Sequence, residues 1–261
     1  TAQQGDLDLR CTPAPTALEG IAGHQQVAAR RGAHYESEIA LSCWFEQLEV
    51  RGRADGFDAR RKRLEEIKTH KGRLDRQSPS LRALHWAQAR MYGWLLCKAR
   101  DLAQLDVALI YFDIDTERET EFVEQWQAKD LREHFEAQCR QFIAWARQEA
   151  AHRQERDAAL RALTFAHGEF RVGQRELAEA VYRATSKRRV LLAQAPTGIG
   201  KTAGTIFPAL KALPGQSVDK LFYLAAKTSG RQLALDALRD LRDQSAAPIR
   251  VLEMVARDKA C

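Results

Sequence analysis

The sequence lacks closely spaced cysteines. Its five cysteines stand at positions 11, 43, 97, 139 and 261, and no two of them form a C-x-x-C pair. This spacing gives no self-contained zinc site and does not suggest a disulfide framework. We therefore expect reduced thiols and a cytoplasmic location.

Long apolar runs are also absent. No apolar stretch reaches the roughly 20 residues that a membrane-spanning helix needs. The opening TAQQGDLDLRCTPAP has no basic segment followed by an apolar one, as a secretory signal would. We expect a soluble, intracellular protein with no membrane partner.

Positive charge is in excess. The 261 residues include 41 Lys and Arg against 35 Asp and Glu, which gives a net charge of +6. A basic balance favours a polyanionic partner, nucleic acid first, although a basic solvated surface has the same composition. The length exceeds that of a usual single domain, so the sequence predicts two domains.

The first part of the chain predicts a helix followed by a hairpin. From about Val27 to Gln47, apolar residues recur at helical spacing without proline, which would place His34 and Glu38 on one helical face. The stretches LEVRGRADGFD and RLEEIKT then read as two opposed strands joined by the polar turn ARRK.

The next segments predict two helices and two strands. Ser78 and Pro79 mark the start of a long amphipathic helix, LRALHWAQARMYGWLLCKARDL. LDVALIYFDI predicts a mostly buried strand, and a charged edge strand is expected from Thr116. The stretch 127–163 then predicts a closing helix.

A composition shift marks a domain boundary. Around TFAHGEFRVGQ, glycine and aromatic residues replace the charged helical pattern, and strand, glycine-rich loop and helix then follow in βαβ order. We place the boundary near residue 164, which gives domains 1–163 and 164–261 in an α/β protein.

Charged side chains gather on the predicted hairpin. Alternation along the strand 64–69 puts Glu66 and Lys68 on one face, about 7 Å apart at their Cα atoms. If the preceding strand returns Asp55 beside them, two carboxylates and an ammonium converge, which favours a bound Mg²⁺ or Mn²⁺ ion. Such an ion activates water and clamps phosphate. The alternative is a surface strand of ion pairs.

These residues carry a family resemblance. G-R-A-D, followed about ten residues later by E-x-K, resembles the PD-(D/E)XK nuclease superfamily. Gln88 and Tyr92, four positions apart, resemble the QxxxY element of its RecB-like branch, which lies beside the metal site and contacts DNA. The resemblance implies a restriction-endonuclease-like fold in which Asp55 and Glu66 bind the metal ion and Lys68 assists the attacking water.

The resemblance leaves the first metal-ligand position open between two candidates, His34 and Glu38. The usual glycine-to-histidine spacing is not reproduced, because Gly32 lies two positions before His34. Some RecB-like nucleases hold an iron-sulfur cluster with one early and three late cysteines. Cys11 has no such trio behind it, so we expect no cluster in this domain. Phosphate contacts are expected from Arg51, Arg53, Arg60 and Arg61.

A phosphate-binding loop is predicted in the second domain. In RRVLLAQAPTGIGKTAGTIF, an apolar strand at 190–193 precedes a glycine-bearing loop and a helix. Gly198 and Gly200 let backbone amides wrap phosphate oxygens. Lys201 reaches the terminal phosphates, Thr202 ligates Mg²⁺, and the helix N-terminus adds favourable partial charge.

This loop resembles the first ATPase motif of superfamily 2 helicases. Arg171 and Gln174 resemble the adenine-reading Q motif, and LFYLAAKTSGRQ resembles motif Ia, although a plain cationic loop is the alternative there. IRVLEMVARDKAC resembles the stretch leading into the iron-sulfur domain of DinG/XPD-type helicases. Cys261 matches the first of four cluster cysteines, so the resemblance places the cluster only in a longer parent protein.

Together the motifs resemble a nuclease–helicase fusion that stops before the DEAH box and the arginine finger. The resemblance implies a metal-dependent DNA nuclease in 1–163 and the start of a RecA-like ATP-dependent helicase domain in 164–261. The expected partners are ATP and single-stranded or branched DNA, in repair or processing. The alternative function is a catalytically inactive nuclease fold that tethers a helicase to DNA. The sequence indicates no oligomeric state.

Overall fold

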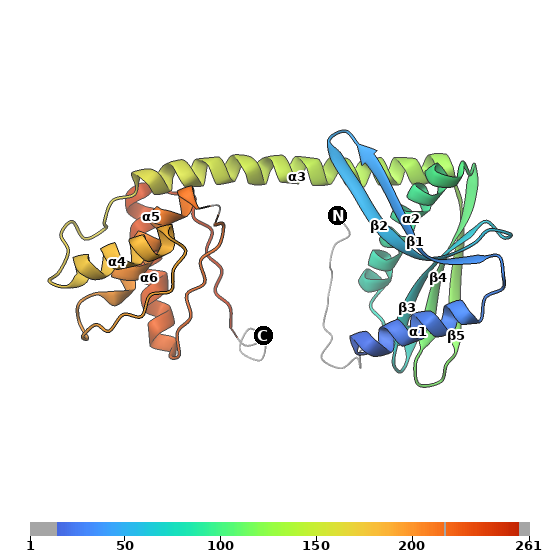
Figure 1. Cartoon of the computed structure of the whole chain (residues 1–261), viewed down its shortest axis with the longest axis horizontal. Coiled ribbons are helices and arrows are strands. Elements are labelled where there is room, and N and C mark those ends of the chain that lie inside the picture. Colours follow the sequence, from blue (N-terminus) through green and yellow to red (C-terminus); the bar gives the residue numbers. More distant parts are fainter. Residues whose placement is uncertain (1–14, 217, 256–261) are drawn as a thin grey trace. The chain divides into compact units, whose positions relative to one another are not determined.

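The computed structural model describes residues 15–216 and 218–255 (Figure 1). Cys11 and Cys261 lie outside the described residues. The chain separates into two compact units, Thr1–Trp145 and Ala146–Cys261. The division falls inside helix α3 (Ala128–Ala162), and the expected boundary near residue 164 lies just after the end of this helix.

The first unit is built on one five-stranded mixed sheet with the order β1-β2-β3-β4-β5. Neighbouring strands are antiparallel except β3 and β4, which are parallel. The crossover between these two strands is helix α2, as a parallel pair requires. The elements of this unit that precede α3 are α1 (Ala17–Ala29), β1 (Tyr35–Phe45), β2 (Leu48–Asp58), β3 (Arg63–His70), η1 (Leu74–Arg76), α2 (Pro79–Arg100), β4 (Gln104–Asp113) and β5 (Glu119–Gln127).

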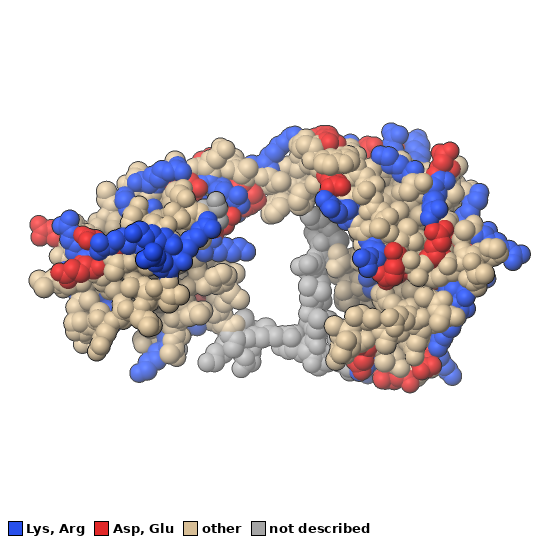
Figure 2. Space-filling model, in the orientation of Figure 1, with Lys and Arg blue, Asp and Glu red and all other residues tan. Residues whose placement is uncertain are grey.

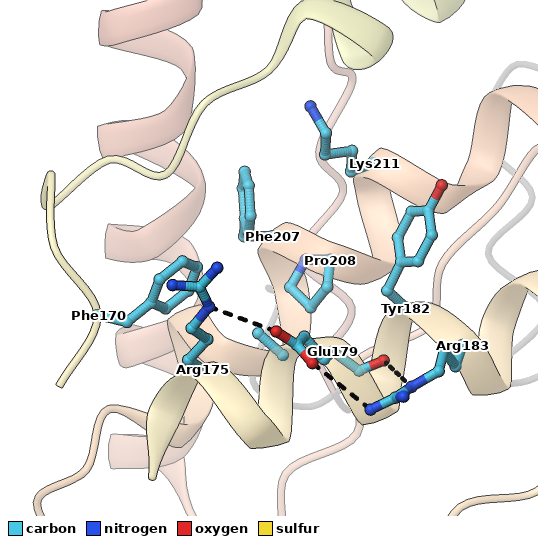
Figure 3. A pocket seen from close by; sticks show the side chains of 9 residues that line it. Phe170, Arg175, Glu179, Tyr182, Arg183, Phe207, Pro208 and Lys211 are labelled. Atoms are coloured by element: carbon cyan, nitrogen blue, oxygen red, sulfur yellow. Dashed lines mark hydrogen bonds and ion pairs between the residues drawn. The ribbon is translucent and has the colours of Figure 1, made fainter. Parts of the chain in front are cut away.

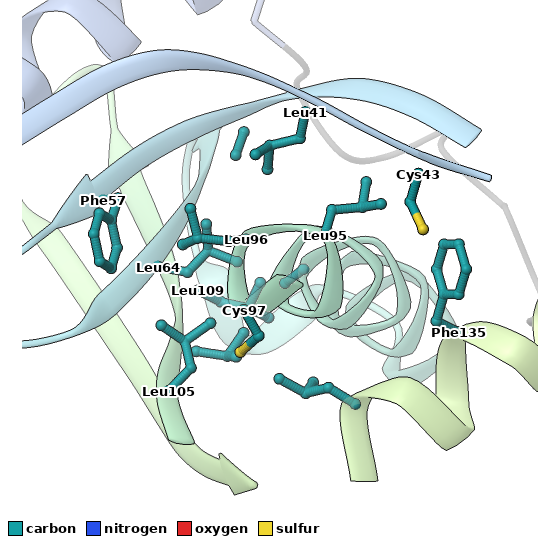
Figure 4. Close-up of a cluster of buried hydrophobic side chains, with 14 of the residues drawn as sticks. Leu41, Cys43, Phe57, Leu64, Leu95, Leu96, Cys97, Leu105, Leu109 and Phe135 are labelled. Carbon is teal, nitrogen blue, oxygen red and sulfur yellow. The ribbon is translucent and has the colours of Figure 1, made fainter. Parts of the chain in front are cut away.

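The core lies on both faces of β4, which is why this strand is almost continuously apolar. On one face, Leu109 and its neighbours pack with Leu95 and Leu96 of α2 (Figure 4). On the opposite face, Ile110 and Phe112 pack with residues that include Val27 of α1. The two helices therefore cover opposite faces of the sheet.

The prediction of a helix at about 27–47 is wrong. The structure places α1 earlier, where Thr16 and Glu19 form a capping box, and residues 35–45 form strand β1. Pairing explains the difference, since β1 forms a long antiparallel ladder with β2 and gains its order from that partner. The hairpin of β2 and β3, helix α2, strands β4 and β5 and helix α3 confirm the other expected elements of this unit.

The second unit is helical in the described residues. Leu160 and Leu163, at and just after the end of α3, pack with Ile206 and Leu210 of α5 and with Leu241 of α6. Its further helices are α4 (Gln174–Ser186), α5 (Lys201–Ala212), η2 (Leu213–Gly215) and α6 (Thr228–Ser245). Helix α3 has 35 residues, but neither it nor any other described helix is apolar enough to cross a membrane.

The strands expected at 190–193 and in LFYLAA are not formed. Neither segment has regular secondary structure, and no described residue of the second unit belongs to a β-strand. Their apolar side chains are exposed, as Val190, Leu192 and Leu224 show. A strand needs a neighbouring backbone to receive its N–H and C=O groups, and the described residues offer none here. The α/β character of the chain therefore rests on the sheet of the first unit.

Candidate active site

The site forms where β2 separates from β3. The ladder between these strands extends only from Asp58–Arg63 to Gly56–Glu65. Beyond Gly56, strand β2 stays paired with β1 and leaves β3 (Figure 1). The Asp55 carboxylate replaces the lost backbone partner, because its Oδ2 accepts the N–H of Ile67 at 2.7 Å. This bond fixes Asp55 at the fork between the two strands.

Glu66 and Lys68 lie on one face of β3, as the alternation predicted. The Lys68 ammonium donates to Glu66 Oε1 at 2.6 Å and to Gln88 Oε1, on α2, at 3.1 Å. The side chain of Glu66 is only 2% exposed. Burial and the nearby Asp55 carboxylate raise the pKa of Glu66 to about 7, although Lys68 acts in the opposite direction.

A histidine that sequence reasoning missed completes the cluster. His24 of α1 places Nδ1 3.4 Å from Asp55 Oδ1. The hydrogen bond to Asp55 raises the pKa of His24. His24, Glu38 and Asp55 each offer one ligand atom, and these atoms all lie within 4.8 Å of one another. Two carboxylates and an imidazole beside the Glu66 carboxylate can hold a divalent ion such as Mg²⁺ or Mn²⁺.

Of the two candidates for the first ligand, the structure brings Glu38 to this cluster and not His34. Glu38 sits between the register pairs Ser37–Gly56 and Ile39–Ala54, opposite Asp55, with a left-handed φ of 57°. Its carboxylate pairs with Arg53 at 3.0 Å. His34 lies in the turn before β1, where its carbonyl accepts the N–H of Ala59.

Close packing of α1 on β3 brings His24 to the site. A Cβ added to Gly23 would lie 2.5 Å from a Thr69 methyl group, and one added to Gly20 would lie 3.6 Å from Thr69 Oγ1. These two glycines let the helix approach the strand. The signal in the sequence was the capping-box pair Thr16 and Glu19, followed by small residues and then a histidine.

Tyr92 packs differently from Gln88. Its ring lies against Gly52 of β2, where an added Cβ would be 2.5 Å from Tyr92 Cε1. Tyr92 is partly buried against the main core, so in this structure it supports β2. Gln88, one turn earlier, is the member of the pair that contacts Lys68.

The expected phosphate-binding arginines are mixed with acids. Arg51 pairs with Glu49 at 2.6 Å, and Arg61 lies 3.7 Å from Asp58. Figure 2 shows blue and red side chains interspersed on the visible face of the first unit. The basic excess is therefore not gathered into one patch on this face.

The loop at 195–200 adopts a conformation that glycine allows. Gly198 and Gly200 have φ values of 89° and 80°, and α5 begins at Lys201. Arg171 donates to the Gly198 carbonyl at 2.7 Å, and Gln174 donates to the Gly200 carbonyl at 3.0 Å. The residues predicted to read adenine thus hold the predicted phosphate loop.

Lys201 is folded back onto this loop. Its ammonium donates to the carbonyls of Ala195 at 3.0 Å and Pro196 at 2.8 Å. Thr202 follows in the first turn of α5 and is half-buried. A phosphate group would have to replace the two carbonyls as the partner of Lys201.

A separate groove lies between α4 and α5 (Figure 3). Its volume is about 420 Å³. Within it, Glu179 pairs with Arg175 at 3.3 Å and with Arg183 at 3.6 Å, so both arginines already have an acidic partner. The lining residues are Phe170, Arg175, Ala178, Glu179, Tyr182, Arg183, Phe207, Pro208 and Lys211.

Comparisons with known proteins identify no family for this chain. No protein-family model matches the chain. No curated protein matches it either. A solved structure described as "Crystal structure of SSO0001" matches 46% of this chain and 58% of that chain, at 23% identity and a TM-score of 0.32. The match thus spans less than two thirds of that chain, and at this level it supports no statement about fold or function.

Proposed function

We propose that the first unit is a metal-dependent DNA nuclease of the PD-(D/E)XK superfamily, RecB-like branch. The observation that carries the proposal is the convergence of His24, Asp55, Glu66 and Lys68 from α1, β2 and β3 at the fork in the sheet. Glu66 is buried next to the partly exposed Asp55 carboxylate, and two such acids are costly without a cation, so this arrangement favours a site that binds one.

His24, Glu38 and Asp55, whose ligand atoms lie within 4.8 Å of one another, would hold the Mg²⁺ or Mn²⁺ ion together with the neighbouring Glu66 carboxylate. When bound, such an ion lowers the pKa of a coordinated water and stabilises charge on phosphate oxygens. Lys68 lies beside Glu66 and donates to Gln88, so it can orient the attacking water and balance the charge that develops on the phosphate. Hydrolysis of a phosphodiester would leave phosphate and hydroxyl ends.

We also propose that the second unit is the beginning of a DinG/XPD-type helicase domain that binds ATP phosphates at residues 198–202. Supporting this proposal, Arg171 and Gln174 hold the loop, and the amides at the N-terminus of α5 follow it directly. Residues 164–261 contain no DEAH sequence, so we expect these residues alone to bind ATP without turnover. A calorimetric titration with MgATP tests this, with Lys201→Ala as the variant that should bind more weakly.

A cleavage assay tests the nuclease proposal. An end-labelled single strand incubated with wild-type protein should shorten when Mg²⁺ or Mn²⁺ is present and stay intact in EDTA. Lys68→Ala should lower the rate by at least about 100-fold, because the charge that assists attack is removed. A folded Lys68→Ala variant that cuts as fast as wild type would exclude this assignment.

The control substitution should remove an acid that touches neither the site nor the core. Glu65 is unsuitable, although it neighbours Glu66, because it is buried between Arg31 and Arg63 on the other face of β3. Glu133 of α3 has a side chain that is 65% exposed. Glu133→Gln should therefore cut at the wild-type rate. If wild type itself binds the strand but never cuts it, the first unit is a DNA-binding platform.

A further inference from the structure

Next to the Gln88–Lys68 hydrogen bond, a second polar contact joins helix α2 to the sheet. Lys68 of β3 and Tyr111 of β4 are register partners, so they lie side by side on the sheet face that α2 covers. Helix α2 contacts both of them with its side chains. Gln88 accepts from Lys68 at 3.1 Å, and His85 Nδ1 lies 2.8 Å from the Tyr111 hydroxyl. His85 and Gln88 are three residues apart, roughly one turn of 5.4 Å along the helix.

The surroundings of Tyr111 determine which nitrogen of His85 carries the proton. Tyr111 is fully buried, and burial raises its pKa to about 12, so its hydroxyl stays protonated. Arg82 and Gln77 also hydrogen-bond to this oxygen, and both lower the pKa of Tyr111, which is the effect of donors. Because the oxygen already accepts from these donors, we assign its hydrogen to His85 Nδ1, 2.8 Å away. The imidazole proton therefore sits on Nε2.

His85 is also held neutral. Burial, with the positive charges of Lys68 and Arg82, lowers its pKa to about 4. A neutral ring whose Nδ1 already accepts a hydrogen bond and whose Nε2 is protonated has no free lone pair with which to bind a metal ion or take a proton. What it can do is donate one hydrogen bond. Among the described residues no acceptor for Nε2–H is found.

We propose that the Nε2–H of His85 binds a phosphate of the DNA backbone next to the one that is cut. The proposal rests on the proposed nuclease function, because Lys68 then marks the position of the scissile phosphate. His85 stands one helical turn from Gln88, which aims Lys68, and so it reaches a neighbouring phosphate better than the same one. The site is a substrate-binding position, separate from the metal ligands.

Two substrates distinguish binding of a neighbouring phosphate by His85 from a role in the chemistry or in packing. A labelled oligonucleotide carries neighbouring phosphates, whereas bis(p-nitrophenyl) phosphate is a single diester without them. In Mn²⁺, His85→Phe keeps a ring and loses the donor. We expect kcat/KM for the oligonucleotide to fall about fivefold to tenfold, the effect of one lost hydrogen bond, and the rate on the small diester to stay unchanged.

The chain provides a matched control. His70 also lies against the Tyr111 ring, at 6.4 Å between centroids, but its Nδ1 donates to the Gly72 carbonyl at 3.1 Å. In the neutral ring its Nε2 is then an acceptor, so His70→Phe should leave both rates unchanged. His85→Gln, whose amide can still donate, should keep more of the oligonucleotide rate than His85→Phe.

Three outcomes would contradict the inference. Equal losses on both substrates in a folded His85→Phe protein would place His85 in the chemistry or in the packing. Unchanged rates on both would show that it contacts no phosphate. Wild-type protein that cuts neither substrate would remove the proposed nuclease function and this inference with it, whereas the first two outcomes leave that function in place.

Discussion

At the scale of single residues, Glu66 is the side chain whose environment depends most on a cation. It is buried, accepts a hydrogen bond from Lys68 and lies near the Asp55 carboxylate. Without a metal ion, one lysine faces two acids and burial favours the protonated form of Glu66. Binding of a divalent ion would reverse this preference and ionise Glu66.

We predict a pH-dependent loss of stability in the metal-free protein. Burial raises the pKa of folded Glu66 to about 7, above the ordinary value of 4.5 that applies to the unfolded chain. The folded state therefore binds this proton more tightly, so the stability it contributes is fully present below about pH 4.5 and is lost as pH rises through 7. In EDTA, Glu66→Gln should gain about 1–3 kcal/mol of unfolding free energy relative to wild type between pH 5 and 8.

Urea unfolding of both proteins at pH 5, 6, 7 and 8 measures this difference. Glu133→Gln serves as the control, since its exposed side chain has no reason to follow the same pH curve. If the unfolding free energies of wild type and Glu66→Gln change in parallel over this pH range, the raised pKa of Glu66 is contradicted.

At the scale of elements, the fork between β2 and β3 depends on one glycine. Tyr35 at the start of β1 lies over Gly56, and a Cβ added there would be 1.8 Å from the Tyr35 hydroxyl. Gly56 directly follows Asp55, so any shift of this backbone moves the carboxylate. Gly32, in the turn before β1, has nothing within 4 Å of an added Cβ.

We predict that Gly56→Ala destabilises the protein and Gly32→Ala does not. Overpacking of this kind costs about 1–3 kcal/mol, and the Gly56→Ala protein should also lose Mn²⁺ binding because Asp55 is displaced. Thermal unfolding and a calorimetric Mn²⁺ titration of both variants check this. Equal melting temperatures for the two variants would show that Tyr35 moves aside without cost.

The sequence predicted elements whose order comes from local pattern. Ser78 and Pro79 gave the start of α2, and alternation placed Glu66 and Lys68 on one face of β3. Strand β1 was missed, because its order comes from a partner ten or more residues away along most of the ladder. A helix at 27–47 favours His34 as a ligand, whereas the contact of His24 with Asp55 depends on how α1 packs on β3. Tertiary packing of this kind leaves only a weak trace in one sequence.

At the scale of the whole molecule, we propose two phosphate-binding sites, one in each unit. The first gathers carboxylates, an imidazole and a lysine at a fork in a sheet. The second is a glycine-bearing loop ahead of a helix N-terminus. A net charge of +6 is consistent with a polyanionic partner for such a pair. The central proposal is that the first site cuts DNA with a metal ion held by His24, Glu38 and Asp55 beside Glu66.

The most direct test compares two histidines: His34, which the sequence offered as a metal ligand, and His24, which the structure brings to the site. The rate of Mn²⁺-dependent cleavage of a labelled single strand is measured for wild type, His24→Ala and His34→Ala. We predict that His24→Ala loses at least about 100-fold in rate, as expected for a lost metal ligand, and that His34→Ala cuts like wild type. Undiminished cleavage by a folded His24→Ala protein, or loss in His34→Ala alone, would contradict the account.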